Sequence, residues 1–529
     1  MASGELGPNL IQRVNLADAL RRSAALYRDK VALTDANGSL SFRELHEEAN
    51  RVAQGLLDEG IGRGDFVALL FRNCIDFFVA YYACARIGAA ALPLNPTLSV
   101  REMLQLVEES KPIALVAQGD YKEVSEALVA QAESIKLLVL ARTAANSPVT
   151  PSTSLRPRAV PFEELRRDDG ADVEVFVEDR DTVQCIYTSG TTARPKGVLT
   201  SHVAAVFTAL SAAHHLRITD ADSGLVVLPV HHVGGLNDST IPHLTVGASV
   251  MLVDGWNAGN VAALIEKHRV TDVLLTAPMW IDLLNVNAAR TYDWSSMRTC
   301  LFGIATLPPE RAQLLRSLCP NAVALMASGQ TEFCGYEEGQ RIEHQQTKPL
   351  AWGDPTLMTD VGIMDDNGSL LPPGEVGEIV YRGPQAMTAY FGDPGLTDEA
   401  FKFNWFHSGD LGYLDEEHTV FFVDRKKDMI KTGGENVASV EVADVLIGHP
   451  AIGNCAIVGL PHQRWTEAVT AFVITSSETS EEELIAYCKE RLAGYKVPKR
   501  ILLVDELPTT ASGKVQKVKL RTMYRDLYG

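Results

Sequence analysis

The most chemically suggestive stretch of this chain is the run 187–197, which reads Tyr-Thr-Ser-Gly-Thr-Thr-Ala-Arg-Pro-Lys-Gly. Hydroxyl and backbone N–H groups can surround a polyphosphate, glycine lets the backbone approach it, and lysine adds a positive charge. An ordinary surface turn also favours these residues. However, the apolar runs 183–187 and 203–210 flank the segment, and this strand–loop–helix context favours a phosphate-binding loop. Its spacing differs from that of the GxxxxGKS/T loop, which the chain lacks.

Two histidines stand where a predicted strand ends. His231 and His232 follow the apolar run 224–228 and precede two glycines. In open α/β sheets, ligands bind beyond the carboxyl ends of the strands, so these histidines are candidates for a ligand site. A structural role for them stays open at this point.

A hydroxyl beside a carboxylate follows another predicted strand, 322–326. Thr331 and Glu332 form this pair. A Mg²⁺ ion that bridges phosphates needs only one or two protein carboxylates, and Glu332 is suited to supply one. A threonine next to a glutamate is too common to establish the site by itself.

Four further polar motifs lie in the last third of the chain. Asp410 could accept hydrogen bonds from two ribose hydroxyls, or it could form an Asx turn. The charged run 424–428 is typical of a solvated surface, and 431–436 is typical of a glycine-rich turn. Lys514 stands on a loop near the C-terminus. Taken singly, each motif is more typical of structure than of catalysis.

Helix and strand signals alternate along the chain around these motifs. Ser41 with Glu44 and Ser99 with Glu102 form capping boxes that predict helix starts. Short apolar runs between helices of this length indicate parallel βαβ units, so we predict an α/β fold with parallel-rich sheets. From about Val361 the pattern changes to short alternating strands, and an α+β block of about a hundred residues follows. The strands predicted in the N-terminal part are 66–71, 89–93, 113–117, 183–187, 224–228, 249–253, 273–275, 299–302 and 322–326.

The composition indicates an ordinary soluble protein of more than one domain. The chain has 529 residues, 46% of them hydrophobic and 22% charged. Its formal charge of −19 argues against nucleic acid and anionic membrane surfaces as partners. The part from Cys488 onward is instead basic, which suits either an anionic small molecule or a solvated surface.

The cysteines and the N-terminus indicate a cytoplasmic protein. The 8 cysteines are scattered and form neither CxxC nor zinc spacing, so we expect buried free thiols in a reducing compartment. Residues 1–15 lack the apolar core of a signal peptide, and no apolar run is long enough for a transmembrane segment. Whether two copies associate as a homodimer stays open.

Taken together and in this order, the motifs resemble those of the adenylate-forming superfamily, which includes acyl-CoA synthetases, peptide-synthetase adenylation domains and luciferases. The run 187–197 is similar to the family signature YTSGTTGxPKG at all fixed positions but one, and Gly513-Lys514 is similar to its closing motif. The similarity extends from Leu16 to Tyr524. It implies an ATP-dependent acyl-CoA ligase that forms acyl-AMP, releases pyrophosphate, and transfers the acyl group to the thiol of coenzyme A.

The resemblance implies a role for each matched residue. The expected catalytic residues are Thr188, His232, Glu332 and Lys514, and Glu332 is also expected to bind Mg²⁺. Lys514 is expected to bridge the acyl carboxylate and the α-phosphate, while Asp410 and Arg425 hold the ribose. The residues expected to bind ATP are Thr188, Ser189, Gly190, Thr191, Thr192, Lys196, Ser328, Gln330, Thr331, Asp410, Arg425 and Lys514.

The resemblance also implies an acyl pocket and a coenzyme A site. The residues expected to line the acyl pocket are His231, His232, Val233, Gly234, Ala277, Met279, Ile304, Ala327 and Gly329. This mostly small and apolar wall predicts an apolar monocarboxylic acid, either aryl or short-to-medium or long aliphatic. The residues expected to bind coenzyme A are Gly433, Gly434, Glu435, Trp465 and Tyr495, with a tryptophan buried in the core as the alternative for Trp465.

Lys427 occupies the family's hinge position. The resemblance therefore implies an N-terminal ATP- and acyl-binding domain over residues 1–426, and a small mobile α+β C-terminal lid domain over residues 427–529 that carries Lys514. The large domain would contain the parallel-rich α/β sheets and the small β-rich part.

Two positions depart from the family pattern. Ala193 replaces a glycine, and alanine tolerates a positive φ poorly. Ser328 replaces the aromatic residue that stacks on adenine, which could weaken ATP binding by roughly 1 kcal/mol. Neither change removes a charged catalytic group, so we expect activity to survive.

Two other functions remain as alternatives. One is an acyl-AMP ligase that loads a carrier protein, and the other is a non-catalytic acyl-adenylate binder. An amino-acid substrate is disfavoured, because His231 and His232 stand where adenylation domains typically keep an aspartate. The expected partners are therefore a carboxylic acid, ATP, Mg²⁺ and coenzyme A.

Overall fold

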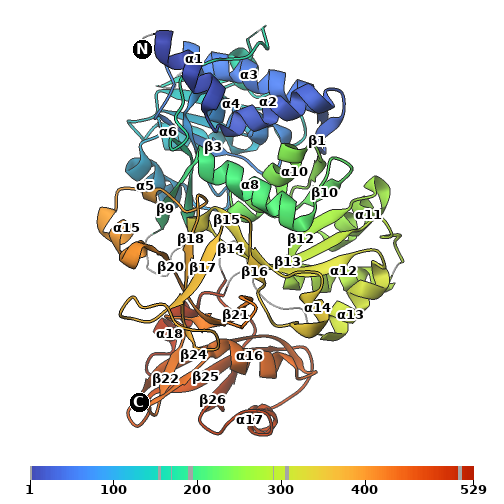
Figure 1. Cartoon of the computed structure of the whole chain (residues 1–529), viewed down its shortest axis with the longest axis vertical. Helices are drawn as coiled ribbons and strands as arrows, with labels where there is room; N and C mark the ends of the chain where they lie inside the picture. Colours follow the sequence, from blue (N-terminus) through green and yellow to red (C-terminus); the bar gives the residue numbers. More distant parts are fainter. Residues whose placement is uncertain are drawn as a thin grey trace. The chain divides into compact units, whose positions relative to one another are not determined.

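The computed structural model describes residues 3–152, 157–167, 169–188, 195–289, 291–303, 309–509 and 515–528. The chain forms two compact units (Figure 1). The first contains residues up to 360 together with 382–401, and the second contains residues 361–381 and 402–529. The boundary predicted at Lys427 falls inside the second unit, and the division into domains at that residue stays a prediction.

The first unit contains a nine-stranded sheet in the order β16-β15-β14-β13-β12-β10-β11-β1-β2. The six strands from β14 to β1 are parallel, whereas β2, β15 and β16 join the edges in antiparallel pairing. The strands are β1 (Val31–Asp35), β2 (Gly38–Ser41), β10 (Ser223–Val226), β11 (Ser249–Leu252), β12 (Asp272–Thr276), β13 (Thr299–Gly303), β14 (Val323–Gln330), β15 (Gly335–Gly339) and β16 (Asp354–Pro355).

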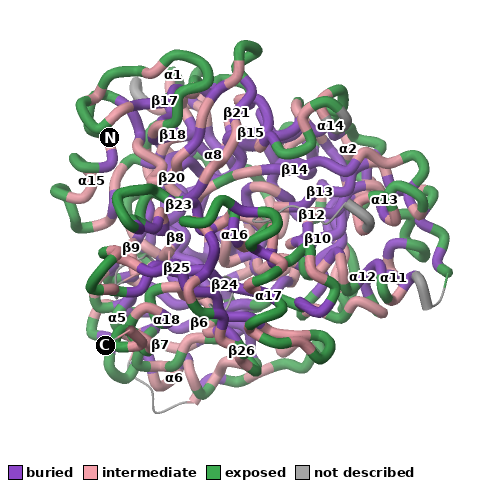
Figure 2. The backbone as a smooth tube through the Cα atoms, turned by 90° about the horizontal axis from the view of Figure 1, so that it is seen from below, coloured by how far each residue is buried: buried purple, intermediate pink, exposed green. Residues whose placement is uncertain are grey.

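An eight-stranded sheet in the same unit has the order β19-β9-β8-β4-β3-β5-β6-β7. The strands from β8 to β7 are parallel, and β9 and β19 are antiparallel additions at one edge. Most of these strands are buried in Figure 2, as their apolar runs predict. The strands are β3 (Phe66–Leu70), β4 (Ala90–Pro93), β5 (Ala114–Ala117), β6 (Leu137–Leu140), β7 (Arg158–Pro161), β8 (Thr182–Thr188), β9 (Lys196–Ser201) and β19 (Ala389–Tyr390).

Helices of the first unit cover these sheets. Both predicted capping boxes are present, at Ser41 and Glu44 and at Ser99 and Glu102. The helices are α1 (Ser3–Gln12), α2 (Leu16–Tyr27), α3 (Phe42–Asp58), α4 (Ile75–Ile87), α5 (Val100–Ser110), η1 (Gly119–Tyr121), α6 (Lys122–Val129), α7 (Phe162–Leu165), α8 (His202–Leu216), α9 (Val233–Gly235), η2 (Leu236–Thr240), α10 (Ile241–Val246), α11 (Ala258–His268), α12 (Ala277–Ala289), α13 (Pro309–Leu318), η3 (Thr331–Phe333), α14 (His344–Thr347) and α15 (Pro394–Ala400).

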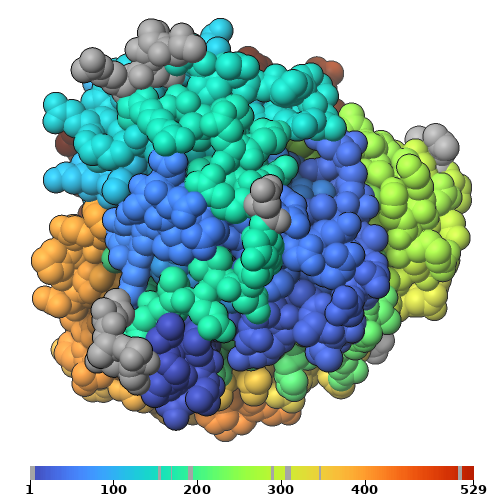
Figure 3. All heavy atoms as spheres, turned by 90° about the horizontal axis from the view of Figure 1, so that it is seen from above, coloured from blue at the N-terminus to red at the C-terminus, as the bar shows by residue number. Residues whose placement is uncertain are grey.

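The N-terminal segment is fixed to the stretch 175–179. Arg13 Nη1 donates to the carbonyl of Val175 at 2.6 Å, and the backbone N–H of Val14 donates to Asp179 Oδ1 at 2.7 Å. Figure 3 shows the blue N-terminal residues beside the teal residues of this stretch. These contacts connect residues that are more than 160 positions apart in the sequence, so they hold the N-terminal segment against the rest of the first unit.

The second unit contains two antiparallel-rich sheets, which confirms the change of pattern predicted after Val361. One has the order β17-β18-β20-β21, and the other has the order β23-β22-β25-β24 with β26 beside β25. The elements are β17 (Asp360–Met364), β18 (Gly377–Arg382), η4 (Lys402–Asn404), β20 (Phe406–Leu414), β21 (Val420–Arg425), β22 (Ile430–Thr432), β23 (Glu435–Val437), α16 (Ser439–Ile447), β24 (Ile452–His462), β25 (Thr466–Thr475), α17 (Glu481–Lys489), β26 (Arg500–Leu503) and α18 (Lys517–Met523).

The α/β fold class is confirmed, and two local predictions are corrected. The segment after Thr188 does not lead directly to a helix, because β9 lies between it and α8 and Lys196 is the first residue of that strand. Asp410 does not lie in a turn but inside β20. Both errors have the same cause, since glycine-rich polar sequences were interpreted as turns although they pair with a neighbouring strand.

Candidate active site

The hairpin of β8 and β9 brings two predicted ATP-binding residues together. Thr188 and Lys196 are cross-strand partners at the end of the hairpin next to its connecting loop. Gly197 is needed here, because a Cβ at this position would lie 3.0 Å from Tyr187 Cζ and 3.1 Å from Phe391 Cβ. The other predicted residues of this loop, Ser189, Gly190, Thr191, Thr192 and the departing Ala193, lie outside the described residues.

Glu332 is held beside this hairpin. It lies on η3 directly after β14, and its carbonyl accepts a hydrogen bond from Met387 N–H at 2.8 Å. Tyr390 Oη donates to Glu332 Oε1 at 2.9 Å. The Lys196 Nζ lies 5.2 Å from the centroid of the same tyrosine ring. Tyr390 therefore contacts both a predicted metal ligand and a predicted phosphate ligand, and no sequence motif had indicated it.

The pKa of Tyr390 lies above its usual value. Burial is the main cause, and the negative charge of Glu332 adds to it. The phenol therefore stays protonated at neutral pH, so it is the donor in its hydrogen bond to Glu332.

The arrangement around Glu332 fits a Mg²⁺ ion that takes most of its ligands from phosphates and water. Among the described contacts, Tyr390 occupies only Oε1 of the Glu332 carboxylate. Nowhere in the described ranges do three or more His, Cys, Asp or Glu side chains gather into a preformed cage. A single carboxylate that uses one oxygen in the described contacts fits the donor set such an ion needs.

The two histidines lie on the loop between β10 and α9, as predicted. His232 is the N-cap of α9, and its Nδ1 accepts a hydrogen bond from Gly234 N–H at 3.4 Å. Burial, together with the neighbouring His232, lowers the pKa of His231 to about 4, so His231 is neutral at pH 7. A neutral imidazole beside an acyl carboxylate can donate or accept a hydrogen bond without adding charge.

Asn73, which the sequence had not indicated, holds this histidine loop. Its Nδ2 donates to the carbonyls of Leu228 at 2.9 Å and Val253 at 3.1 Å, and its Oδ1 accepts from Val230 N–H at 3.0 Å. The histidine loop also needs a glycine at position 235, because a Cβ there would lie only 2.4 Å from the Leu228 carbonyl oxygen.

The predicted acyl-pocket residues follow neighbouring parallel strands. β10, β12, β13 and β14 pair in parallel in this sequence, so their carboxyl ends meet at one edge of the sheet. Val233 and Gly234 follow β10, Ala277 and Met279 start α12 after β12, and Ala327 and Gly329 lie near the end of β14. Ile304 lies outside the described residues.

Ser328 and Gln330 lie on β14, which pairs with β15 across a bulge. The backbone N–H of Gln330 donates to both carboxylate oxygens of the buried Glu337, at 2.9 and 3.0 Å. Burial and the nearby Glu338 raise the pKa of Glu337 well above its usual value. Thr331, on η3, is buried.

Asp238 is a second buried carboxyl near this edge. A Cβ on Gly335 would lie 1.9 Å from Asp238 Oδ1, and this oxygen has no hydrogen-bond partner among the described residues. Burial raises the pKa of Asp238 to about 8. The surroundings of β14 and β15 are therefore less apolar than the sequence predicted.

In the second unit, the two predicted ribose ligands face each other. Asp410 on β20 and Arg425 on β21 are cross-strand partners, and Arg425 Nε lies 3.2 Å from Asp410 Oδ1. Asp410 is buried and Arg425 is exposed. An aspartate fixed in this way is suited to accept hydrogen bonds from two neighbouring hydroxyls.

The predicted hinge residue Lys427 lies two residues after the end of β21. Its pKa is lowered to about 8, mainly by loss of hydration and also by the positive charge of Arg425, against the opposing effects of Asp428 and Asp410. Asp428 in turn accepts a hydrogen bond from Arg521 on α18 at 2.9 Å. Charged side chains thus surround the backbone at the predicted hinge.

Four of the five residues predicted to bind coenzyme A lie at or beside the turn between β22 and β23. Gly433 and Gly434 form this turn with φ of +61° and +91°, conformations that favour glycine, and Glu435 starts β23. Gly433 N–H donates to the Trp465 carbonyl at 2.9 Å. Tyr495 is exposed, and the Lys496 Nζ lies 5.8 Å from its ring centroid.

Trp465 is half-buried, which excludes the alternative of a core tryptophan. Its ring stacks on His462 with centroids 4.3 Å apart, and Lys499 Nζ lies 5.0 Å from the ring centroid. Arg464 lies 5.7 Å from the same ring. An aromatic face with two cations suits a nucleotide with phosphate groups. Lys514 lies outside the described residues.

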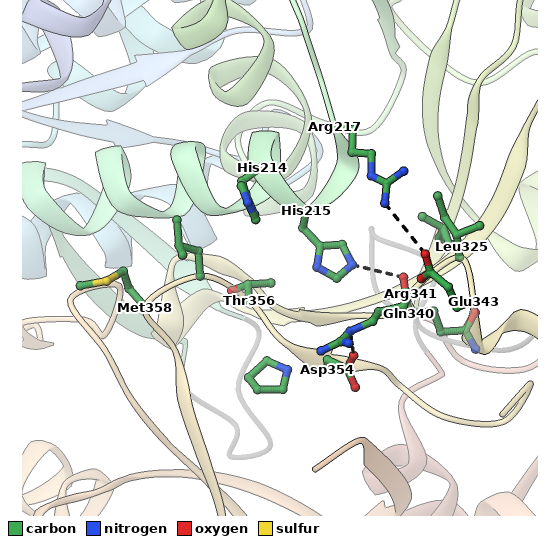
Figure 4. Close-up of a pocket in the computed structure, with 13 residues that line it drawn as sticks. His214, His215, Arg217, Leu325, Gln340, Arg341, Glu343, Asp354, Thr356 and Met358 are labelled. Atoms are coloured by element: carbon green, nitrogen blue, oxygen red, sulfur yellow. Dashed lines mark hydrogen bonds and ion pairs between the residues drawn. The ribbon is translucent and has the colours of Figure 1, made fainter. Parts of the chain in front are cut away.

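A hollow of about 830 Å³ lies elsewhere, at the C-terminal end of α8 (Figure 4). Its walls include His215, Arg217 and Arg341, none of which was predicted to bind a substrate. Figure 4 shows that these groups are satisfied by neighbours: His215 Nε2 lies 3.2 Å from the Gln340 carbonyl, and Arg217 lies 4.0 Å from Glu343. The hollow is therefore separate from the site described above.

These features define the class of protein: an adenylate-forming enzyme, with a large α/β part that carries the phosphate loop and a smaller C-terminal part. The family model described as AMP-binding enzyme matches residues 20–391, and the one described as AMP-binding enzyme C-terminal domain matches residues 441–514. The chain belongs to the family of AMP-binding enzymes, and the resemblance is confirmed.

Curated relatives and solved structures agree with this class. A 2-succinylbenzoate–CoA ligase of Bacillus cereus is 31% identical over 509 residues, which cover 96% of this chain and 98% of the relative. A feruloyl-CoA synthase of Amycolatopsis is 32% identical over 505 residues, which cover 95% and 98%. The o-succinylbenzoate CoA synthetase of Bacillus subtilis, solved with its acyl-adenylate intermediate, is 29% identical with a TM-score of 0.81, covering 95% of this chain and 97% of that one. The protein is an AMP-forming acid–CoA ligase.

Within the part of the chain that the structure describes, no helix is both long and apolar enough to cross a membrane.

Proposed function

We propose that this protein joins an aryl carboxylic acid to coenzyme A, with the residues named above in the roles the family assigns to them. The observation that carries the proposal is that Lys196 and Glu332 both contact Tyr390 at the loop end of the β8–β9 hairpin. A lysine and a carboxylate at one phosphate-binding loop supply the positive charge and the metal ligand that a triphosphate needs. The substrate class rests on the similarity to ligases named for succinylbenzoate and ferulate.

In the first half-reaction, a carboxylate oxygen of the acid attacks the α-phosphorus of ATP and pyrophosphate leaves. Thr188 and Lys196 would hold the outgoing phosphates, and Lys514 would lie between the acid and the α-phosphate. Mg²⁺ bound at Glu332 would neutralise charge on the phosphate oxygens. Asp410 and Arg425 would fix the ribose, which sets the distance between the α-phosphorus and the acid.

In the second half-reaction, the coenzyme A thiolate attacks the carbonyl carbon of the acyl-AMP and AMP leaves. We propose that residues 427–529 move as a lid about Lys427 between the two steps, which withdraws Lys514 and brings the turn at Gly433 and Gly434 to the acyl-AMP. The charged groups around Lys427 support a movable joint, since ion pairs at a surface are easily exchanged for water.

Coenzyme A is favoured over a carrier protein as the acceptor. Trp465, Arg464 and Lys499 form an exposed aromatic and cationic patch that suits the phosphates and adenine of coenzyme A. The curated relatives named above are CoA ligases or synthases. The 8 cysteines carry no disulfide, which agrees with the reducing cytoplasm proposed as the location.

The test is a substrate screen with both products measured. The purified protein is incubated with ATP, Mg²⁺, coenzyme A and a panel of succinylbenzoates, cinnamates, benzoates and fatty acids of graded length. The proposal expects pyrophosphate and thioester in equal amounts, with an aryl acid preferred. Thioester only with a carrier protein would favour the first alternative. No pyrophosphate with any acid would favour a non-catalytic binder.

A further inference from the structure

Tyr390 connects the strands β19 and β9 and the short helix η3, which are far apart in the sequence. It lies on β19, where Tyr390 pairs with Val198 of β9 in antiparallel register. The neighbouring Phe391 N–H donates to the Gly197 carbonyl at 2.7 Å, which fixes β19 against the hairpin. The backbone of Tyr390 is also held from the other side, because its N–H donates to Thr397 Oγ1 at 3.0 Å. The ring therefore has a defined place that does not depend on Glu332.

The side chain of Tyr390 presents a different chemical group to each of its two polar neighbours. Its hydroxyl donates to Glu332 Oε1 at 2.9 Å, and its ring lies 5.2 Å from the Lys196 ammonium. The ring is almost fully buried at 8% exposure, so both interactions are shielded from water. A shielded hydrogen bond to a carboxylate and a shielded cation–π contact are stronger than their exposed counterparts.

The geometry points to Tyr390 as a positioning residue for adenylation. We propose that it fixes the Glu332 carboxylate and the Lys196 ammonium relative to each other, so that both contact the same Mg²⁺-bound triphosphate. The proposal rests on the function proposed above. Tyr390 touches neither the acid nor the nucleotide in this account, and it acts through the two residues that do. By occupying Oε1, it orients the other oxygen of Glu332 for the metal ion.

A purely structural role would require only the ring. The ring packs at the edge of the sheet beside β9, and a phenylalanine would fill the same volume. The hydroxyl matters only if the orientation of Glu332 matters. Tyr390→Phe therefore separates the two roles, since it keeps the fold and the cation–π contact and removes the hydrogen bond.

The experiment measures the binding of ATP to the full-length protein by calorimetry, with Mg²⁺ and with EDTA. In the wild type, Mg²⁺ should strengthen ATP binding. In Tyr390→Phe, we expect this enhancement to fall about tenfold, while binding in EDTA changes little. Removal of the ring in Tyr390→Leu should weaken binding in EDTA as well, by a further few-fold, because Lys196 loses its partner. Tyr121→Phe is the matched control: it removes a hydroxyl that accepts from Arg72 at 2.6 Å, and ATP binding should not change.

A second measurement tests whether the effects of changing Tyr390 and Glu332 depend on each other. If Tyr390 acts through Glu332, Tyr390→Phe should have little further effect in a Glu332→Gln background. Additive effects, or an unchanged Mg²⁺ enhancement in Tyr390→Phe, would overturn the proposal. A wild type in which Mg²⁺ does not strengthen ATP binding would also overturn it. Binding that follows these expectations without pyrophosphate release from any acid would instead refute only the proposed function.

Discussion

The side chains assigned to ATP have different surroundings in the two units. Thr188, Lys196 and Tyr390 of the first unit lie on paired strands, and Tyr390 contacts its neighbours through a hydrogen bond to Glu332 and a ring contact with Lys196. Asp410 and Arg425 of the second unit also lie on paired strands, but their side chains form an ion pair, and Lys427 lies two residues further along among charged groups. We therefore expect changes at the residues proposed for the ribose and the hinge to act mainly through charge, and changes at Tyr390 to act mainly through position.

The largest expected effect on activity comes from changing Lys514, which lies in the proposed lid domain. Lys514→Ala should slow adenylation about a hundredfold or more, because one positioned donor at a developing charge contributes on the order of 3 kcal/mol. Pyrophosphate release measures this step. Thioester formation from supplied acyl-AMP should remain nearly intact, and an equal loss in both steps would contradict a lysine that serves only the first.

A change at Lys427, the proposed hinge, should slow the second half-reaction and largely spare the first. Lys427→Pro restricts the backbone φ, so the lid should no longer reorient between the steps. We expect thioester formation from acyl-AMP to fall by about a hundredfold and pyrophosphate release to change much less. Lys427→Ala, which leaves the backbone free, is the control and should retain both steps. A loss of adenylation as large as that of thioester formation would show that Lys427 is not a hinge.

The ribose contact gives an intermediate effect. Asp410→Asn keeps the size of the side chain but removes the charge that pairs with Arg425. Hydrogen bonds to charged groups contribute about 1.5–3 kcal/mol, so the KM for ATP should rise roughly tenfold to a hundredfold. Asp366→Asn is a control in the same unit, because this exposed aspartate pairs with Lys426 at 2.8 Å and has no assigned role. An unchanged KM for ATP in Asp410→Asn would remove the ribose assignment.

The last expected effect is on stability rather than on activity, and it distinguishes the buried edge of the first unit from its surface. The folded-state pKa of Asp238 is raised to about 8 by burial, so the unfolded chain loses this proton first as the pH rises. The wild type should therefore lose stability between about pH 4 and pH 8, by at most about 1.4 kcal/mol per pH unit.

Asp238→Asn should remove this dependence, and its advantage in Tm over the wild type should grow from pH 5 to pH 8. Asp58→Asn is the control with the opposite sign, because Gln54 and Arg167 hold the pKa of the exposed Asp58 below its usual value. A difference between Asp238→Asn and the wild type that is constant with pH would indicate that Asp238 is not buried in its neutral form.

The sequence was sufficient where function depends on short, continuous motifs. The strand before Thr188, both capping boxes and the histidine loop after β10 are where the patterns predicted them. The β9 strand was missed, because Lys196 and Gly197 were interpreted as the end of a loop. Their partner strand, β19, lies almost 200 residues further along the chain.

The residues that hold the site could not be predicted for the same reason. Tyr390, Asn73 and Asp238 each act on groups that are distant in the sequence, and none has a distinctive local pattern. A buried carboxyl such as Asp238 also looks like a surface residue in a sequence, since only packing can shift its pKa. Motifs therefore pointed to the groups that we propose touch substrates, and the structure showed which neighbours contact those groups.

The most direct test of the central claim is the exchange of labelled pyrophosphate into ATP in the absence of coenzyme A. We propose that the acid is activated as acyl-AMP before any thiol takes part. The exchange of pyrophosphate into ATP should therefore require an aryl acid and Mg²⁺ and should proceed without coenzyme A. Exchange that requires coenzyme A, or that is absent with every acid, would contradict it.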